Sequence, residues 1–217
     1  MASSRPAVLV LTGFGINCDY ETEAAFLAAG AAAQKVHVND LIDKPGLLSA
    51  FQILAVPGGF SFGDDIGSGK VFANKLKYRL GEPFLKFLER DTLVIGICNG
   101  FQVLVKLGLL PGGAQGRLEQ TATVTFNDSG RFEDRWVLLE VNQDSPCVFT
   151  RSLEWVELPV RHGEGKFYTG NHGLLERLDS SHQIALRYAN PDRTRPASYP
   201  ANPNGSEADI AGVCDPT

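Results

Sequence analysis

The sequence has little of what marks a nucleic-acid binder or a membrane protein. Its 217 residues carry a formal net charge of −5 and no block of lysine or arginine, so phosphate contacts have no obvious source. No stretch approaches the roughly 18 uninterrupted apolar residues of a membrane span. The N-terminal stretch lacks the long apolar region of a secretory signal. We therefore expect a cytoplasmic protein with neither nucleic acid nor membrane as a partner.

Cysteine is sparse and scattered. The four cysteines (Cys18, Cys98, Cys147 and Cys214) include no C-x-x-C pair, so we expect no metal site and no redox site. In a cytoplasmic chain they should be reduced, and three of them should be ordinary small hydrophobic residues. Cys98 differs from the other three because of its neighbours.

The hydrophobic content of 43% is enough to bury a core without a metal or a disulfide. The length suits one α/β domain that spans residues 1–217. In the first half, compact apolar runs alternate with helical patterns, which predicts a mostly parallel sheet covered on both faces. We therefore expect a flavodoxin-like three-layer sandwich. The predicted strands are 7–11, 35–40, 53–59 and 92–97, and the predicted helices are 19–30, 70–80, 83–91 and 101–108.

The second half is rich in short β-like runs. They should extend the same sheet or add an antiparallel one. The predicted strands are 121–126, 135–141, 155–160, 183–189 and 209–214, with one helix at 171–178 and a Pro/Asn-rich loop at 190–205.

Two glycine-rich motifs only partly match nucleotide-binding patterns. Residues 13–18 (GFGINC) begin like a dinucleotide fingerprint, but Cys18 stands at the third glycine position. Residues 63–71 (GDDIGSGKV) resemble a phosphate loop, but Asp64 replaces its first glycine and Val71 replaces its magnesium-binding hydroxyl. We interpret the first motif as a tight turn and expect no nucleotide site in either.

Two candidate nucleophiles follow strands. Ser61 lies in GFSFG, formally the G-x-S-x-G elbow, but more glycine and aspartate follow it instead of a helix. Cys98 lies in GICNG, directly between a strand and a helix. The flanking glycines permit a strained turn, the helix N-terminus should lower the thiol's pKa, and the N–H of Asn99 should face an oxyanion. Cys98 is therefore the favoured nucleophile, and the alternative is a buried cysteine at a tight turn.

The motif GICNGFQ resembles the G-x-C-x-G-x-Q signature of the class I (triad) glutamine amidotransferases. Within that family, PGGFSFGDDIGSGK (57–70) is similar to the glutaminases of phosphoribosylformylglycinamidine synthases. Three further stretches carry the same resemblance, and together the motifs cover essentially the whole chain. They are GFGINCDYET (13–22), LPVRHGEGKF (158–167) and NPNGSEADIAGVCDPT (202–217).

The resemblance implies a reaction and a partner. A cysteine attacks the side-chain amide of glutamine, ammonia leaves, and water hydrolyses the resulting thioester. The ammonia passes to a synthetase subunit, which amidates formylglycinamide ribonucleotide in purine biosynthesis. A small third subunit is a possible further member of the complex. No cofactor is expected in this chain, and ATP and magnesium should belong to the partner.

The resemblance also implies roles for individual residues. Cys98 is the nucleophile, Gly58, Gly59 and Asn99 supply oxyanion contacts, and Gln102 helps to hold the substrate. In the second half, the candidates for substrate contacts come from the HGEG segment and from FNDSGRFEDR (126–135), where a solvated loop is the alternative. They are His162, Gly163, Glu164, Asn127, Ser129 and Arg131.

The family's catalytic base and its orienting acid come from a later His/Glu motif that these residues lack. His37, His172 and His182 lie in ordinary structural settings, and His162 stands where the family binds substrate. We therefore expect this chain to be truncated at its C-terminus and nearly inactive alone. Two other functions stay open: a non-catalytic binding or regulatory protein on the same fold, and another cysteine hydrolase that uses His162.

Overall fold

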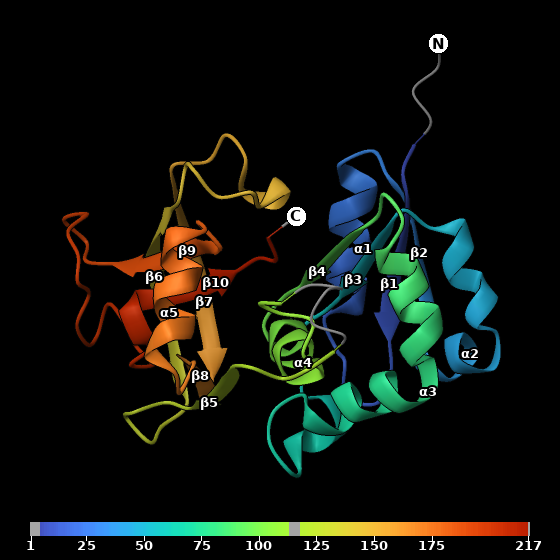
Figure 1. Cartoon of the computed structure of the whole chain (residues 1–217), viewed down its shortest axis with the longest axis horizontal. Helices are drawn as coiled ribbons and strands as arrows, with labels where there is room; N and C mark the ends of the chain where they lie inside the picture. The colour runs from blue at the N-terminus through green and yellow to red at the C-terminus, as the bar shows by residue number, and fades with distance from the viewer. Residues whose placement is uncertain (1–4, 113–117, 217) are drawn as a thin grey trace. The chain divides into compact units, whose positions relative to one another are not determined.

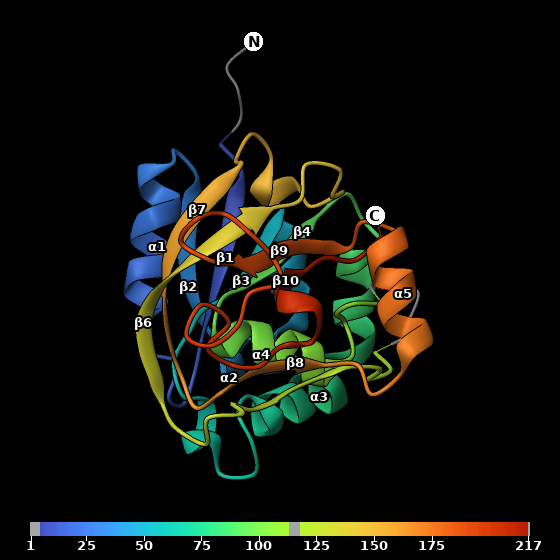
Figure 2. The ribbon, with the colours of Figure 1, turned by 90° about the vertical axis from the view of Figure 1, so that its left-hand side faces the viewer.

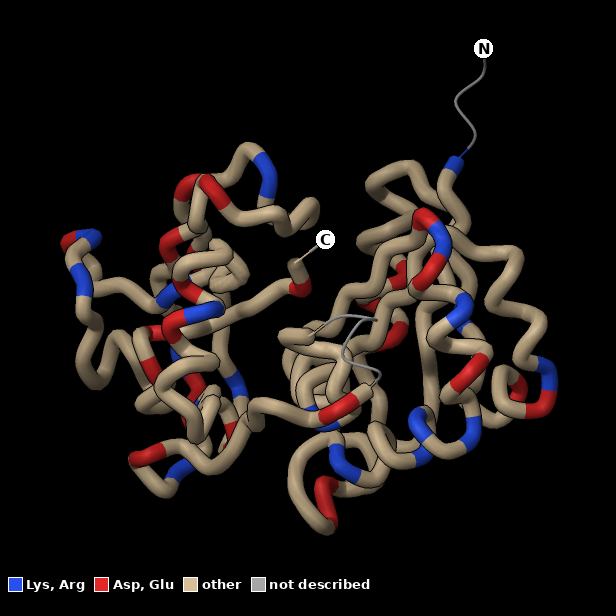
Figure 3. The backbone as a smooth tube through the Cα atoms, viewed as in Figure 1, with Lys and Arg blue, Asp and Glu red and all other residues tan. Residues whose placement is uncertain are grey.

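In a computed structural model, residues 5–112 and 118–216 are described. The chain forms two compact units, residues 1–107 and 108–217. In each unit, acidic and basic residues are interspersed along the backbone (Figure 3). Over the described residues, no helix combines the length and apolar character needed to cross a membrane.

The first unit contains the predicted parallel sheet, in the order β2-β1-β3-β4. This is the strand order of a flavodoxin-like sheet, so the predicted fold class is confirmed. The elements are β1 (Ala7–Thr12), α1 (Asp19–Ala28), β2 (Ala32–His37), α2 (Val38–Asp43), η1 (Pro45–Ala50), β3 (Ile53–Val56), η2 (Ser61–Asp64), α3 (Lys70–Leu88), β4 (Leu93–Gly96) and α4 (Asn99–Leu107).

Both faces of this sheet are buried at its centre, where β1 and β3 are continuous apolar runs. Val8 and Val10 pack with Ala55 in one cluster, against Phe26 of α1. The alternate residues of β1 point to the other face and are also fully buried. Figures 1 and 2 show α1 and α3 on opposite sides of these strands, as right-handed crossovers require. The carboxyl ends of the strands therefore meet at one edge.

Two elements differ from the sequence prediction. The predicted helices 70–80 and 83–91 are one helix, α3, which continues through Pro83 and ends at Leu88. Proline removes a helical hydrogen bond, but Leu80, Phe84 and Phe87 beside it are all buried, and this packing holds the helix together. The predicted strand 35–40 ends at His37, whose Nδ1 accepts the N–H of Asn39 at 3.2 Å and caps α2.

The second unit resolves the open alternative, because its strands form antiparallel sheets of their own. One sheet has the order β10-β9-β6-β7, and β5 pairs with β8 in a second. α5 lies at one edge of this unit (Figure 2). The elements are β5 (Thr123–Phe126), β6 (Glu133–Val141), η4 (Val148–Thr150), β7 (Trp155–His162), β8 (Glu164–Tyr168), α5 (His172–Ser180), β9 (Ile184–Ala189), η5 (Glu207–Asp209) and β10 (Ile210–Val213).

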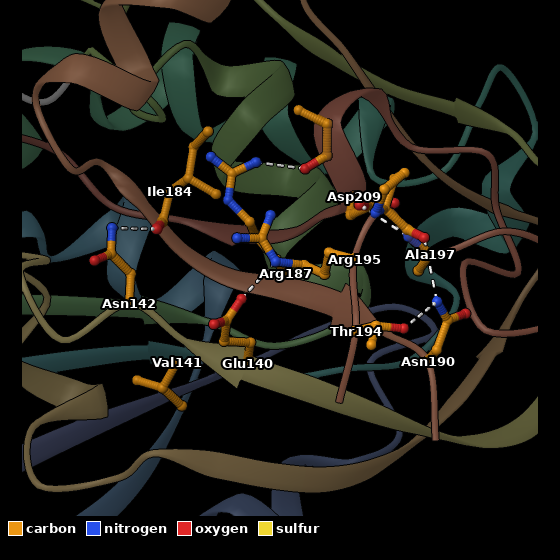
Figure 4. Close-up of polar contacts among 12 residues, drawn as sticks. Glu140, Val141, Asn142, Ile184, Arg187, Asn190, Thr194, Arg195, Ala197 and Asp209 are labelled. Atoms are coloured by element: carbon orange, nitrogen blue, oxygen red, sulfur yellow. Dashed lines mark hydrogen bonds and ion pairs between the residues drawn. The ribbon is translucent and has the colours of Figure 1, made fainter. Parts of the chain in front are cut away.

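The loop 190–205 is irregular, as predicted, and side-chain contacts hold it (Figure 4). Arg195 donates to Glu140 of β6 at 2.5 Å, and the N–H of Ala197 donates to Asp209 at 3.1 Å. Ala197 is itself buried in the core beside β6 and β9. The Pro/Asn-rich composition therefore gives a loop that is packed onto its sheet.

Candidate active site

Cys98 stands at the sharp turn between β4 and α4. Its backbone is left-handed, with a φ of +54°, which is a strained conformation for a residue with a side chain. The thiol lies on the exposed side of this turn. This is the geometry of a nucleophile elbow, as the sequence predicted.

The two glycines of GICNG allow this turn because neighbouring backbone passes too close for a side chain. A Cβ at Gly100 would lie 1.8 Å from the carbonyl oxygen of Val56, at the end of β3. A Cβ at Gly96 would lie 2.6 Å from the carbonyl oxygen of Gly100. The signature glycines are therefore needed for close packing of backbone at the strand ends.

The loop at Gly58 and Gly59 lies directly beside the elbow. A Cβ at Gly58 would lie 3.4 Å from the Cβ of Cys98, and the N–H of Gly59 hydrogen-bonds the Cys98 sulfur. The N–H of Asn99 does the same from the other side of the turn. These two N–H groups both lower the pKa of the Cys98 thiol, whereas the carbonyl of Gly58 accepts the N–H of Cys18 at 3.2 Å.

The GFGINC motif holds this loop in place. The N–H of Phe60 donates to the carbonyl of Gly15 at 2.7 Å, and Ile16 forms a β-bridge with Gly59. Gly59 has a φ of +143°, and a Cβ there would lie 2.4 Å from the carbonyl oxygen of Gly15. The predicted tight turn therefore has a second task, which is to clamp the glycine loop against the nucleophile.

The pKa of the Cys98 thiol is raised above its ordinary value. Desolvation is the largest cause, because protein atoms crowd the thiol although part of its surface reaches solvent. The N–H groups of Asn99 and Gly59 lower the pKa, and the nearby charge of Asp64 raises it. The net direction is opposite to the sequence prediction, so a base is needed to form the thiolate at neutral pH.

Gln102 and Ser61 are both buried at this site. Gln102 lies one turn after Cys98 on α4, and its Oε1 accepts the side-chain amide of Asn99 at 2.9 Å. Ser61 is 1% exposed, and its N–H donates to Asn99 Oδ1 at 3.1 Å. Ser61 therefore does not present its hydroxyl at an elbow, which agrees with the preference for Cys98.

In the second unit, His162 ends β7 and Glu164 begins β8, with Gly163 between them. The pKa of His162 is lowered, first by burial, and its Nδ1 has no hydrogen-bond partner among the described residues. Asn127 fixes this corner: its Nδ2 donates to the carbonyl of His162 at 2.8 Å, and its Oδ1 accepts the N–H of Gly165 at 2.9 Å. Asn127 thus holds the backbone of the predicted binding strand.

Ser129 and Arg131 lie on the turn that follows Asn127. The hydroxyl of Ser129 accepts the N–H of Arg131 at 3.3 Å. Both residues line an open cavity of about 580 Å³, with Tyr199 and Asn202 from the loop 190–205. Their predicted role in substrate or partner contact stays a prediction, whereas Asn127 is buried and is not the solvated residue of the alternative interpretation.

The remaining histidines have structural settings. His172 is the first residue of α5 and pairs with the exposed Glu176, while Asn171 caps the helix. His182 is exposed in a turn after α5. Among the described residues, no group of three His, Cys, Asp or Glu side chains could hold a metal ion.

The other three cysteines all reach solvent. Cys18 is exposed, and Cys147 and Cys214 are half-buried. The thiol of Cys214 hydrogen-bonds Cys147 and lowers the pKa of Cys147 to about 6, while the pKa of Cys214 is raised by the same contact. Ser145 lies beside the pair, with its hydroxyl 3.5 Å from the Cys214 sulfur.

Comparison with known proteins identifies the family. The CobB/CobQ-like glutamine amidotransferase domain family matches residues 5–217. Phosphoribosylformylglycinamidine synthase subunit PurQ of Dehalococcoides mccartyi is 48% identical over 212 residues, which cover 98% of this chain and 80% of that relative. This chain belongs to the PurQ family of glutamine amidotransferases.

Further relatives agree with the PurQ assignment. PurQ of Methanococcus maripaludis is 45% identical over 216 residues, covering 98% of this chain and 78% of the relative. The solved structure of PurLQS from Thermotoga maritima matches with a TM-score of 0.69 at 28% identity, and the match covers 97% of this chain and 85% of that one. The family predicted from the sequence is confirmed, and the chain is an enzyme subunit of the amidotransferase class.

One site residue was missed at the sequence level. Asp64 accepts the side-chain amide of Asn99 at 3.3 Å and so reaches the nucleophile helix from the glycine loop. In the sequence, Asp64 stands out only as a mismatch to a phosphate loop. The available signal was its place in the family-like segment PGGFSFGDD.

Proposed function

We propose that this chain hydrolyses the side-chain amide of glutamine through Cys98 and supplies ammonia to a synthetase partner. The partner uses ATP and magnesium to convert formylglycinamide ribonucleotide to formylglycinamidine ribonucleotide in purine biosynthesis, with a small third subunit in the complex. The name shared by the PurQ relatives and the name of the PurLQS assembly support this assignment. The observation that carries it is the elbow at Cys98, with two N–H groups directed at its sulfur.

The geometry supports the following chemistry. The Cys98 thiolate attacks the amide carbon of glutamine, and the carbonyl electrons move to its oxygen. The N–H groups of Gly59 and Asn99 stabilise the oxyanion, and loss of one such donor typically costs about 100-fold or more in rate. The carbon–nitrogen bond then breaks, the nitrogen takes up a proton, and ammonia leaves. Water attacks the thioester, which releases glutamate and restores the thiol.

This reaction needs a base and an acid. The raised pKa of Cys98 means that little thiolate forms unaided at neutral pH. The family's His/Glu motif is not among these 217 residues. We therefore propose that the chain alone binds glutamine weakly and hydrolyses it very slowly. Substantial glutaminase activity of the chain alone that is lost in His162→Ala would contradict this proposal and favour a hydrolase that uses His162.

Covalent labelling tests the assignment. A chloromethyl ketone analogue of glutamine should alkylate Cys98, and mass spectrometry locates the adduct. Glutamine in large excess should protect Cys98, because the chain alone binds glutamine weakly. Cys98→Ser should abolish the adduct. Cys18→Ser is the matched control, because Cys18 is a neighbouring exposed thiol that should not be the labelled residue. Labelling that glutamine does not slow would point to a different cysteine hydrolase, and no labelling at Cys98 would point to a non-catalytic protein.

A further inference from the structure

The side chain of Asn99 has a different role from its backbone N–H. It is 1% exposed and lies between the nucleophile helix and the glycine loop. Its Oδ1 accepts the N–H of Ser61 at 3.1 Å, and its Nδ2 donates to Gln102 Oε1 at 2.9 Å and to Asp64 Oδ1 at 3.3 Å. One buried amide therefore connects both structures that supply N–H groups to Cys98.

Asp64 fixes the orientation of that amide. A carboxylate only accepts hydrogen bonds, so it must face the NH₂ end of Asn99 and leave the oxygen for Ser61. Asp64 is itself held, because its carboxylate accepts the hydroxyl of Ser68 at 3.1 Å and the N–H of Gly69 at 3.3 Å. Its φ of +55° places it in a strained turn that these contacts maintain.

The glycine loop is thus held from two sides. The GFGINC motif binds its outer edge, with Phe60 and Phe62 donating to the carbonyls of Gly15 and Phe14. Asn99 binds its inner edge at Ser61, two residues after Gly59. The inner link joins the loop to the residue next to Cys98, and together with the outer contacts it holds the segment that carries the Gly59 N–H.

We propose that Asp64 and Asn99 form a positioning pair that aligns the Gly59 N–H with the Asn99 N–H at the nucleophile. The inference rests on the proposed function, because aligned N–H groups matter only if an oxyanion forms there. The pair touches no reacting atom through its side chains. It acts by holding the N–H groups of Gly59 and Asn99 in a fixed relative position. Such donors stabilise an oxyanion poorly once they are displaced by a small distance.

Two reagents separate positioning from simple thiol reactivity. A chloromethyl ketone analogue of glutamine places a ketone oxygen in the oxyanion site as the sulfur attacks. Iodoacetamide alkylates the same sulfur by direct displacement and forms no oxyanion. Loss of alignment should therefore slow the first reagent at saturation and spare the second.

The variants use the full 217-residue chain. Asp64→Ala should lower the saturating rate of the ketone at Cys98 by about 10-fold, because the Asn99 amide loses the acceptor that orients it. It should leave the iodoacetamide rate at neutral pH equal or higher, because the Asp64 carboxylate raises the pKa of Cys98. Asn99→Asp should slow the ketone, relative to iodoacetamide with the same variant, by about 10-fold or more, because two carboxylates then face each other. The double variant Asp64→Asn/Asn99→Asp restores one carboxylate and one amide and should recover at least about 3-fold of the loss caused by Asn99→Asp.

Asp65→Ala is the matched control, since it removes a neighbouring exposed carboxylate of the same turn and should keep the wild-type ketone rate. Circular dichroism checks that each variant is folded. The positioning role is overturned if both single variants react with the ketone like the wild type, or if both reagents slow equally. If the wild type reacts with iodoacetamide but shows no saturable, glutamine-protected ketone reaction, the proposed function fails first and the inference fails with it.

Discussion

At the strand ends of the unit of residues 1–107, three glycines let backbone segments approach one another directly, whereas in the unit of residues 108–217 buried asparagine side chains hold the turns. In the first unit, Gly59, Gly96 and Gly100 each lie so close to another segment that a Cβ would fall within 2.6 Å of a backbone oxygen. In the second unit, Asn127 and Asn202 are buried and bond the backbone of the turns beside them.

The difference follows from the backbone groups of each unit: some must stay free in the first unit, and those of buried loops must find partners in the second. The oxyanion site that we propose at Cys98 needs free N–H groups beside the thiol, so the strand ends must approach without side chains between them. The antiparallel unit has long irregular loops, and their backbone groups need partners once they are buried. Added atoms should therefore damage the first unit, and removed atoms should damage the second.

The largest effect is expected for Gly100→Ala. The new methyl group would lie 1.8 Å from the carbonyl oxygen of Val56, and the strand end must move to accommodate it. We expect a loss of about 3 kcal/mol in the free energy of unfolding, measured by urea denaturation, and loss of glutamine-protected labelling at Cys98. Gly81→Ala in α3 is the control, because a Cβ there meets nothing within 4 Å, and it should stabilise the chain by about 0.5–1 kcal/mol. Equal free energies of unfolding for the two variants would contradict the claim that close backbone contact at Gly100 excludes a side chain.

A smaller effect is expected for Asn127→Ala. The change leaves the carbonyls of His162 and Arg131 and the N–H of Gly165 without their partner, which should cost about 2–3 kcal/mol by urea denaturation. The exposed Asn17 of the first unit is the control, and Asn17→Ala should change stability by less than about 0.5 kcal/mol. A similar loss in both variants would show that burial does not determine how much these amide side chains contribute to the free energy of unfolding.

The smallest effect on stability is expected from the thiol pair of the second unit. Cys147 has a pKa of about 6, so iodoacetamide labelling should be half-maximal near pH 6, whereas labelling of Cys98 should still rise above pH 8. Because the folded pKa of Cys147 is depressed, its stabilising contribution is complete above the unfolded value of about 8.5 and is lost as the pH falls through 6. Cys214→Ala should move the midpoint of labelling toward 8.5. An unchanged midpoint would show that the contact with Cys214 does not lower the pKa of Cys147.

Much of the first unit could be predicted from the sequence. The runs at β1, β3 and β4 are continuously apolar, and the elbow at Cys98 follows from a strand, two glycines and a helix in direct succession. The joining of two predicted helices into α3 could not be predicted from local signals, because buried side chains on both sides of Pro83 outweigh the local breaker.

The second unit was less predictable. The strand and helix patterns located most elements, but they left open whether the strands extend the parallel sheet or form their own. β8 was expected only as a strand end at HGEG. Its pairing with β5 depends on contacts between segments about 40 residues apart, and local periodicity carries no information on that pairing.

The sequence by itself determined the family, the strand–turn–helix setting of Cys98 and the glycines that make the turn possible, because these features are local. Only the tertiary structure decided that Asp64 reaches Asn99, that the GFGINC turn clamps the glycine loop, and that the pKa of Cys98 rises. Those outcomes depend on the folding of distant segments into one site, where burial outweighs the helix terminus that a local argument invokes.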